Sequence, residues 1–310
     1  MDEKNMQFAN FNITFGENDL PMLEHFEDII YPAFTSGFIR GKKEEIPYYS
    51  FDDVKIREID DEYVLVGNYI KSTEYKVITT VTDGVLVSSP ADVPTAPYSR
   101  FVIFLKNHRM VLVRNETNSP DIRSFQKTVR EILSKYIREA NHNRPKESKL
   151  PFAVVHIVDI PLKDSIEQVL KDVNKVNWLK LRFFPLNNDL DPTPLAQLVK
   201  SNMQKVGSKT SNLVFNSPDS KQGIKDVLEA TGGMAVATLQ VTDSDGEKRR
   251  IKEGSFSSTT KVEYSGNLRA SGDAYLIAQA KKDCTITVTS PENLSIFNRM
   301  IHTFKKLMSQ

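Results

Sequence analysis

Four basic residues between positions 123 and 138 have the types and the spacing that binding to phosphate groups requires. At 100° per residue, Arg123, Lys127, Arg130 and Arg138 fall within one arc of a helix. The apolar residues of the segment fall roughly opposite and indicate a core-facing side: Phe125, Val129, Ile132, Leu133 and Tyr136. Like charges on one helix face repel each other. This face is therefore either a solvated surface or a surface for a polyanion.

Two further basic clusters could extend this surface. Lys248, Arg249, Arg250 and Lys252 follow a predicted hairpin turn, where alternate side chains point to opposite faces, so about half of them could contact one ligand. Lys205 and Lys209, together with Lys200, border a predicted strand at residues 211–215. Contacts of this type bind phosphate without reading sequence, and their affinity falls steeply in salt. No aromatic platform, recognition helix or zinc finger is recognisable, which predicts non-specific binding.

Catalytic and metal-binding motifs are not recognisable in the chain. The five histidines are scattered, and His156 lies in an apolar strand pattern typical of a hydrogen-bonded core residue. Asp189 and Asp191 form a DxD pair that could hold magnesium, although the surrounding residues are typical of a loop. Hairpin geometry explains Asp243 and Asp245. We predict no cofactor and no metal, and we keep a metal-dependent nuclease with dispersed carboxylates as an alternative.

The basic helix needs a scaffold, and the residues before it predict an antiparallel β-meander. A strand near 8–15 precedes a helix at 21–34 that we expect to stop near Pro32. Strands at 54–59, 62–70, 75–81 and 84–89 follow, with turns at Asp60-Asp61, Ser72-Thr73 and Asp83-Gly84. Residues 89–97 contain three prolines and predict a loop. Two more strands, 100–105 and 109–114, lead to a helix capped by Ser119 that runs to about Ala140.

The segment 140–151 is polar, contains two prolines and has no apolar periodicity, so we place a domain boundary there. The predicted domains are residues 1–141, a β-meander ending in the basic helix, and 151–310, a mixed α/β part. In the second, strands at 152–160, 177–184, 211–215 and 234–241 alternate with helices at 162–173, 195–205 and 220–231. If the middle helix is an insertion, the order βαββαβ predicts a ferredoxin-like sandwich. The overall class is α+β. A final helix spans 293–308.

Charge is unevenly distributed although the net charge is only +1. Residues 1–65 hold 6 basic and 15 acidic groups, whereas residues 106–149 hold 11 basic and 5 acidic groups. This asymmetry either reflects ordinary variation or favours self-association or a polyanionic partner. A protein-interaction subunit, in which the basic helix pairs with the acidic region of another copy, is a further alternative.

Three features of the sequence predict the cellular compartment of the protein. The N-terminus has no secretory pattern, no apolar run is long enough to span a membrane, and the single cysteine, Cys284, reads as a buried thiol in a strand. We therefore expect a soluble, cytoplasmic protein.

The order of these segments resembles the RexA-like phage exclusion proteins and, more distantly, the RdgC-like DNA-binding proteins. The resembling parts are the Pro97-Tyr98-Ser99-Arg100-Phe101 entry to a strand, the strand from Val111 to Arg114, and the Ser119-Pro120 helix start. Asn216-Ser217-Pro218 and the strand with the turn from Leu239 to Gly246 occupy similar positions. The resemblance covers about half the chain. The acidic region at 1–65 has no counterpart in it.

The resemblance implies a cytoplasmic homodimer that binds DNA without sequence preference in phage exclusion or antiviral defence, with a membrane protein as a further partner. Our leading hypothesis is accordingly a non-enzymatic DNA-binding protein of such a defence system. The phosphate contacts expected first are Arg123, Lys127, Arg130 and Arg138.

Overall fold

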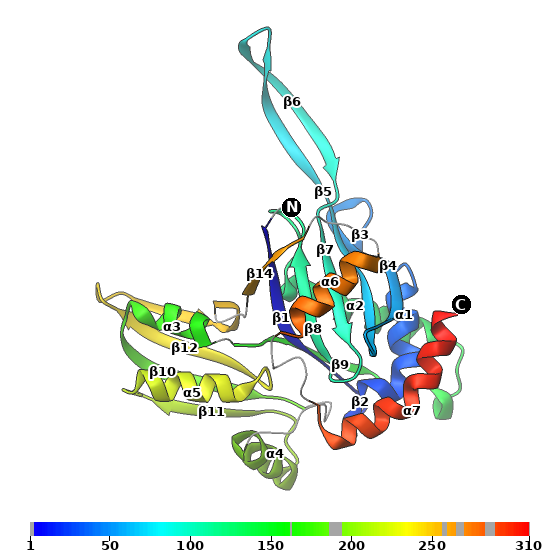
Figure 1. Ribbon diagram of the computed structural model, residues 1–310, viewed down its shortest axis with the longest axis vertical. Helices are drawn as coiled ribbons and strands as arrows, with labels where there is room; N and C mark the ends of the chain where they lie inside the picture. Colours follow the sequence, from blue (N-terminus) through cyan, green and yellow to red (C-terminus); the bar gives the residue numbers. More distant parts are fainter. Residues whose placement is uncertain are drawn as a thin grey trace.

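The computed structural model describes residues 3–161, 163–185, 194–255, 259–264, 270–282 and 289–309. They form a large body built on one antiparallel sheet and a small body built on another (Figure 1). The large body contains the residues up to 161 and those from 259 onward, and the small body contains residues 163–255. The fold is α+β with antiparallel strands, as the sequence predicts.

The large sheet has the strand order β14-β1-β8-β7-β5-β4-β3, with β2 and β9 also paired to β1 and β6 paired to β5. Its strands are β1 (Glu3–Phe15), β2 (Leu20–Pro21), β3 (Ile39–Lys42), β4 (Glu45–Ile59), β5 (Glu62–Thr82), β6 (Val85–Thr95), β7 (Tyr98–Phe104), β8 (Arg109–Arg114), β9 (Ala153–Asp159) and β14 (Thr259–Glu263). β1 pairs with strands that are distant in sequence, so it joins the beginning, middle and end of the chain.

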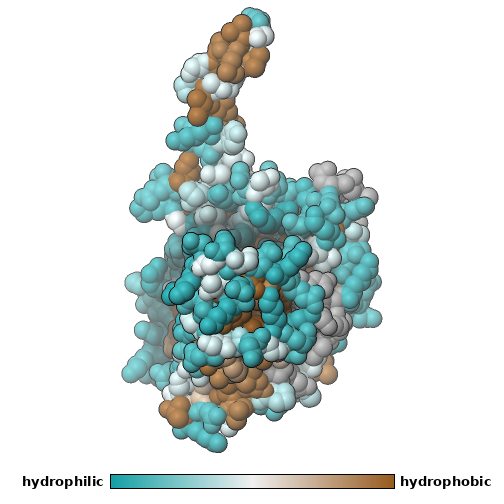
Figure 2. All heavy atoms as spheres, turned by 90° about the vertical axis from the view of Figure 1, so that its left-hand side faces the viewer, coloured by the Kyte–Doolittle hydropathy of each residue, from teal (hydrophilic) through white to brown (hydrophobic). Residues whose placement is uncertain are grey.

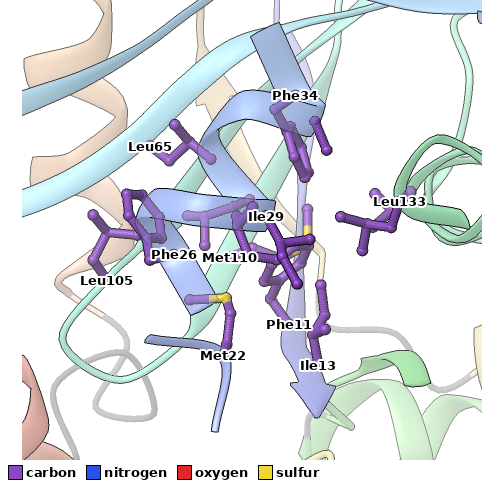
Figure 3. Packing of buried hydrophobic residues seen from close by; sticks show 14 of the residues in the cluster. Phe11, Ile13, Met22, Phe26, Ile29, Phe34, Leu65, Leu105, Met110 and Leu133 are labelled. Atoms are coloured by element: carbon purple, nitrogen blue, oxygen red, sulfur yellow. The ribbon is translucent and has the colours of Figure 1, made fainter. Parts of the chain in front are cut away.

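Helices cover both faces of the large sheet. On one face lie α1 (Tyr31–Thr35) with the 3-10 turn and π turn before it, α2 (Ile122–Ala140) and α7 (Pro291–Met308). Phe11 and Met110 of the sheet pack there against Phe26, Ile29 and Leu133 (Figure 3). On the other face lies α6 (Ala270–Ala280), whose Leu276 and Ile277 are fully buried.

The alternation of side chains explains why β7 and β8 are apolar without interruption. Phe101 and Ile103 of β7 enter the core under α2, whereas Val102 and Phe104 enter the core under α6. β8 alternates in the same way. A strand that is buried on both faces has a continuous run of apolar residues, because neither of its faces contacts water.

The small body is a four-stranded antiparallel sheet in the order β11-β10-β12-β13. Its elements are α3 (Lys163–Lys171), β10 (Val173–Phe183), α4 (Pro194–Val206), β11 (Ser211–Asn216), α5 (Lys221–Thr231), β12 (Ala235–Asp243), β13 (Lys248–Lys252) and a 3-10 turn at Glu253–Ser255. α3 and α5 pack on one face, where Ile166 and Leu228 are fully buried among the inward residues of β10 and β12.

Four local predictions differ from the structure. The N-terminal helical segment continues through Pro32, which occupies the first turn of α1, where a missing N–H does no harm. Ser72-Thr73 is not a turn, because β5 runs unbroken from Glu62 to Thr82. Residues 89–95 of the proline-containing segment 89–97 belong to β6, which pairs only with β5 and so tolerates proline at its free edge. Asp121, rather than Ser119, caps α2, since its carboxylate accepts from the N–H of Ser124 at 2.8 Å.

The predicted division into residues 1–141 and 151–310 does not follow the two sheets. β9, β14, α6 and α7 come after residue 151 but belong to the large body. The ferredoxin-like arrangement is not formed, because it would need β9 inside the small sheet, and β9 instead pairs with β1 from Ala153 to Asp159. Local periodicity identified β9 and α7 but not α6, and it carries no information about which strands pair.

Candidate nucleic-acid interface

β10 exposes every second side chain on the side of the small sheet that α3 and α5 leave uncovered. Leu179 and Leu181 are buried in the small core. Trp178, Lys180 and Arg182 point the other way, with Arg182 exposed and the other two half-buried. Because successive side chains of a strand point to opposite faces, one aromatic and two basic side chains of β10 lie in a row on this face.

The strand register extends this row across the whole sheet. The residues of this side, called the open face, are Asn212, Val214 and Asn216 of β11, Trp178, Lys180 and Arg182 of β10, Val236, Thr238, Gln240 and Thr242 of β12, and Lys248, Arg250 and Lys252 of β13. All of them are exposed or half-buried. Five are basic and none is acidic. The remainder is polar apart from Trp178, Val214 and Val236, so the open face has a positive potential across its width.

Arg250 and Trp178 associate directly on the open face. The guanidinium carbon of Arg250 lies 5.9 Å from the centroid of the indole ring. This separation lies within the range of a cation–π interaction. A guanidinium over an aromatic ring offers a planar group on which a nucleobase can stack and a charge for the adjacent phosphate.

The basic arc predicted on α2 lies on the exposed side of that helix. Arg123, Lys127, Arg130 and Arg138 are all exposed. The opposite side is buried in the large core, with Phe125, Val129 and Leu133 fully covered. The four residues, called the α2 stripe, are thus held in place by the apolar packing of the helix.

The α2 stripe meets the open face at His156 of β9. Arg130 donates to the carbonyl oxygen of Val155 at 3.1 Å, which brings its side chain across the free edge of β9. The ring of His156 stacks on Phe184, just beyond the end of β10, at 4.2 Å between centroids. Burial, together with the charges of Arg130 and Arg182, lowers the pKa of His156 to about 4. Arg130 of α2 and Arg182 of the open face therefore both lower the pKa of the same imidazole ring.

A second junction lies at the other end of the stripe. The guanidinium of Arg123 occupies the space beside Gly254, where an added Cβ would come within 2.5 Å of Nη2. Gly254 lies in the 3-10 turn at Glu253–Ser255 that follows β13. Arg123 also lines a polar hollow of about 280 Å³ with Asp121 and Asp159. These carboxylates offset part of its charge, so Arg123 contributes less to the positive potential than Arg130 does.

Four other basic residues that the sequence singled out lie away from the open face. Arg249 points to the opposite side of β13 and pairs with Asp243. Lys205 is exposed on α4, and Lys209 pairs with Asp19 at 2.7 Å. Arg138, at the far end of α2, lines a separate hollow with Lys135 and Glu139. Of the predicted hairpin cluster, Lys248, Arg250 and Lys252 reach the open face.

Acidic residues of the N-terminal region pair within the chain. Glu24 pairs with Arg299 and Glu27 with Lys306, each at 2.8 Å, so α7 neutralises part of the acidic segment. Glu3 pairs with Lys261 at 2.8 Å. Among the residues that the structure describes, the acidic region thus has basic partners of its own that do not belong to α2.

Further contacts hold the small body against the large sheet near β1 and β8. Asn12 donates to the carbonyl oxygen of Pro185 at 2.7 Å, and Arg109 donates to that of Gly232 at 2.8 Å. Gly233 has φ +81°, and an added Cβ would lie 3.1 Å from Cβ of Asn10. A side chain at 233 is excluded both by the backbone conformation and by this approach. The joint holds the open face beside the α2 stripe.

Sequence reasoning missed Trp178, Lys180 and Arg182, which the prediction treated only as part of an apolar strand. The signal was present in the alternation of NWLKLRFF, where the polar and aromatic residues occupy every second position. What was missing was the register with β12 and β13, which places Arg250 beside Trp178.

No group of three His, Cys, Asp or Glu side chains within the described ranges is arranged to hold a metal ion. Asp189, Asp191 and Cys284 lie outside those ranges. Asp243 and Asp245 behave as hairpin residues, since Asp245 accepts from the N–H of Glu247 at 3.1 Å.

The described helices include none that is both long enough and apolar enough to cross a membrane.

No family model matches the chain, and no match was found among the curated proteins or the solved structures.

Proposed function

We propose that this chain binds DNA without sequence preference through the open face and the adjoining α2 stripe. The observation that carries the proposal is the composition of the open face, which has five basic side chains and a tryptophan and no acidic residue. A solvated surface of a protein with net charge +1 would be expected to mix both signs.

The chemistry expected of this surface is phosphate neutralisation combined with base stacking. Lys180 and Arg182 lie two residues apart on β10, about 6.6 Å along the strand, and Lys252 lies two strands away, at about 9.6 Å, so the three can follow a flexible backbone. Trp178 offers a ring that any base can stack on, which is why such binding tolerates any sequence. Single-stranded DNA is the preferred form in this proposal, because its bases are free to stack.

The affinity of this type of binding falls as the salt concentration rises, and the number of phosphate contacts sets how steeply it falls. Each phosphate contact contributes about −0.7 to the slope of log affinity against log salt for single strands. The five cations of the open face alone give a slope of about −3.5, and the α2 stripe raises it to about −6 if all four of its cations take part.

A role in antiviral defence is the context that we propose for this binding. It rests on the resemblance of the segment order to RexA-like exclusion proteins, and no contact within the chain supports it independently.

The test is a fluorescence anisotropy titration of the full chain with labelled oligonucleotides over a range of salt. Lys180→Glu with Arg250→Glu is expected to weaken binding at least about tenfold at low salt. Lys205→Glu with Lys282→Glu is the matched control, since both lysines are exposed outside the interface and the change in net charge is the same.

An equal loss of affinity in both double variants would show that only net charge matters and would overturn the assignment of the open face. Absence of binding by the native chain at low salt would overturn the proposed function itself. Cleavage of the oligonucleotide in the presence of magnesium would favour the nuclease alternative.

A further inference from the structure

β5 and β6 extend beyond the large sheet as a two-stranded arm (Figure 1). β5 pairs with β7 only as far as Ile70 and with β4 only as far as Ser72. Beyond that point, residues 73–95 pair only with each other, and Asp83 and Gly84, both with positive φ, form the turn. We call residues 73–95 the arm.

The arm is unusually apolar for an exposed segment. It carries seven of the sixteen exposed large hydrophobic residues in the described part of the chain, namely Tyr75, Ile78, Val81, Val85, Leu86, Val87 and Val93. Ile78, Val81 and Leu86 are each about 70% exposed. In the space-filling view hydrophobic residues gather near the end of the arm, and others lie farther down it (Figure 2). Contiguous exposed apolar surface of this kind marks an interaction site.

The register sorts the arm into two different sides. Tyr75 lies opposite Val93, Val77 opposite Ala91, and Val81 opposite Leu86 on one uncharged side, where Thr79 opposite Ser88 is the polar pair that interrupts the apolar ones. We call this the Tyr75 side. On the other side Lys76 lies opposite Asp92 at the base, and the apolar residues Ile78, Val85 and Val87 occur only toward the tip.

Two classes of partner fit this arm poorly. A polyanion is disfavoured, because the arm has one basic residue, Lys76, and three acidic ones, Glu74, Asp83 and Asp92. Insertion into a lipid bilayer is disfavoured, because both strands have free edges along the arm and open edges leave backbone polar groups unsatisfied in hydrocarbon.

We infer that the arm is a self-association element whose Tyr75 side packs against the same side of the arm of a second copy. The side is uncharged, so it is complementary to itself, as a twofold interface requires. A two-stranded ribbon is marginally stable alone in water and gains stability from a further layer. The second arm supplies that layer.

The area available is sufficient for such a pair. At about 60–120 Å² for each apolar side chain buried, the six apolar residues of the Tyr75 side provide roughly 500 Å² per chain and about 1,000 Å² per pair. In an antiparallel pair, the tip of each arm lies at the base of the other arm. The large body of the second copy can then cover the side of the tip that faces away from the other arm. This arrangement accounts for a tip that is apolar on both sides and a base that is apolar on one.

The inference goes beyond the proposed DNA binding and is independent of it. The arm projects from the large body away from the small sheet (Figure 1). Pairing through the arms leaves the open face of each copy accessible, so a dimer would present two DNA-binding surfaces and gain avidity on a long strand.

The test is the mass of the full chain in solution by light scattering and sedimentation. The native chain is expected to have twice the 35.2 kDa of one copy. Val81→Asp with Leu86→Asp places two charges on the Tyr75 side and is expected to give a single copy. Lys76→Asp changes the net charge by the same amount on the solvated base of the other side and is expected to leave the dimer intact.

A native chain of single-copy mass, or a dimer that survives Val81→Asp with Leu86→Asp, would overturn the inference. Co-flotation of a single-copy native chain with lipid vesicles would overturn it in favour of a membrane-binding arm. The affinity of the Val81→Asp/Leu86→Asp variant for a short oligonucleotide is expected to equal that of the native chain, which separates failure of this inference from failure of the DNA-binding proposal.

Discussion

Arg250 of β13 lies over the indole ring of Trp178 of β10, with 5.9 Å between the guanidinium carbon and the ring centroid. The two residues are on strands that are not neighbours, because β12 lies between them. Their contact across β12 makes the open face a continuous surface of aromatic and basic groups, and the first prediction follows from it.

Trp178 is the only tryptophan in the chain, so its fluorescence reports on the open face directly. Binding of single-stranded DNA is expected to quench this emission through base stacking. Trp178→Ala is expected to weaken binding by about 1–3 kcal/mol, which is roughly 5- to 150-fold, while Trp178→Phe retains most of the affinity. Anisotropy of a labelled oligonucleotide measures the affinity. Unchanged tryptophan emission while anisotropy rises would place the DNA elsewhere.

His156 is expected to make stability dependent on pH. Its pKa of about 4 in the folded chain lies below the ordinary value of 6.5, mainly because of burial. The unfolded chain therefore takes up the proton first as the pH falls. The stabilisation is fully present above about pH 6.5 and is lost as the pH falls toward 4.

Urea unfolding at pH 7 and near pH 4.5 measures this loss. Between these pH values His156→Phe, which preserves stacking on Phe184, is expected to lose about 1–2 kcal/mol less than the native chain, a figure discounted for the partial exposure of the ring. The buried His108 is present in both chains and its contribution cancels. Equal losses in the two chains would contradict the prediction.

Gly67 of β5 lies against Phe101, and an added Cβ would come within 2.6 Å of Cζ of that ring. Phe101 is fully buried among other aromatic rings, including Phe34 and Phe125, and has little room to move. Gly67→Ala is expected to destabilise the fold by about 1–3 kcal/mol through overpacking. Thermal and urea unfolding measure the change.

The double variant Gly67→Ala with Phe101→Leu tests the cause. Leucine removes the ring atoms that the new methyl group would meet, so the two changes together are expected to cost less than the sum of the separate changes. Strict additivity would show that the methyl group is accommodated elsewhere.

Arg100 of β7 and Asp273 of α6 form a fully buried bidentate pair, with both nitrogen–oxygen distances at 2.9 Å. Asp273→Asn removes the charge with little change of shape and leaves the guanidinium of Arg100 without its main counter-charge. We expect a loss of about 3 kcal/mol or more. Lys261→Ala breaks the exposed Glu3–Lys261 pair and is expected to cost less than about 1 kcal/mol. Similar losses in the two variants would refute this contrast.

The sequence by itself determined the elements whose periodicity is local. The strands β7 and β8, the hairpin turn at Asp83-Gly84 and the two-sided helix α2 follow from side-chain spacing and turn chemistry, which act over a few residues. The α2 stripe was predictable for the same reason. The apolar side of α2 is buried in the core and its basic side is exposed, as the spacing of residues 123–138 indicates.

Only the tertiary structure decided which strands pair and therefore which surfaces exist. β1 pairs with β8, β9 and β14 in one sheet. β9 therefore belongs to the large body, although it follows the predicted domain boundary. The open face exists because the register brings Trp178, Lys180 and Arg250 together from separate strands. Spacing along a strand sets the side to which each residue points, whereas pairing between distant strands is set by the packing of the whole chain, which no short window of sequence contains.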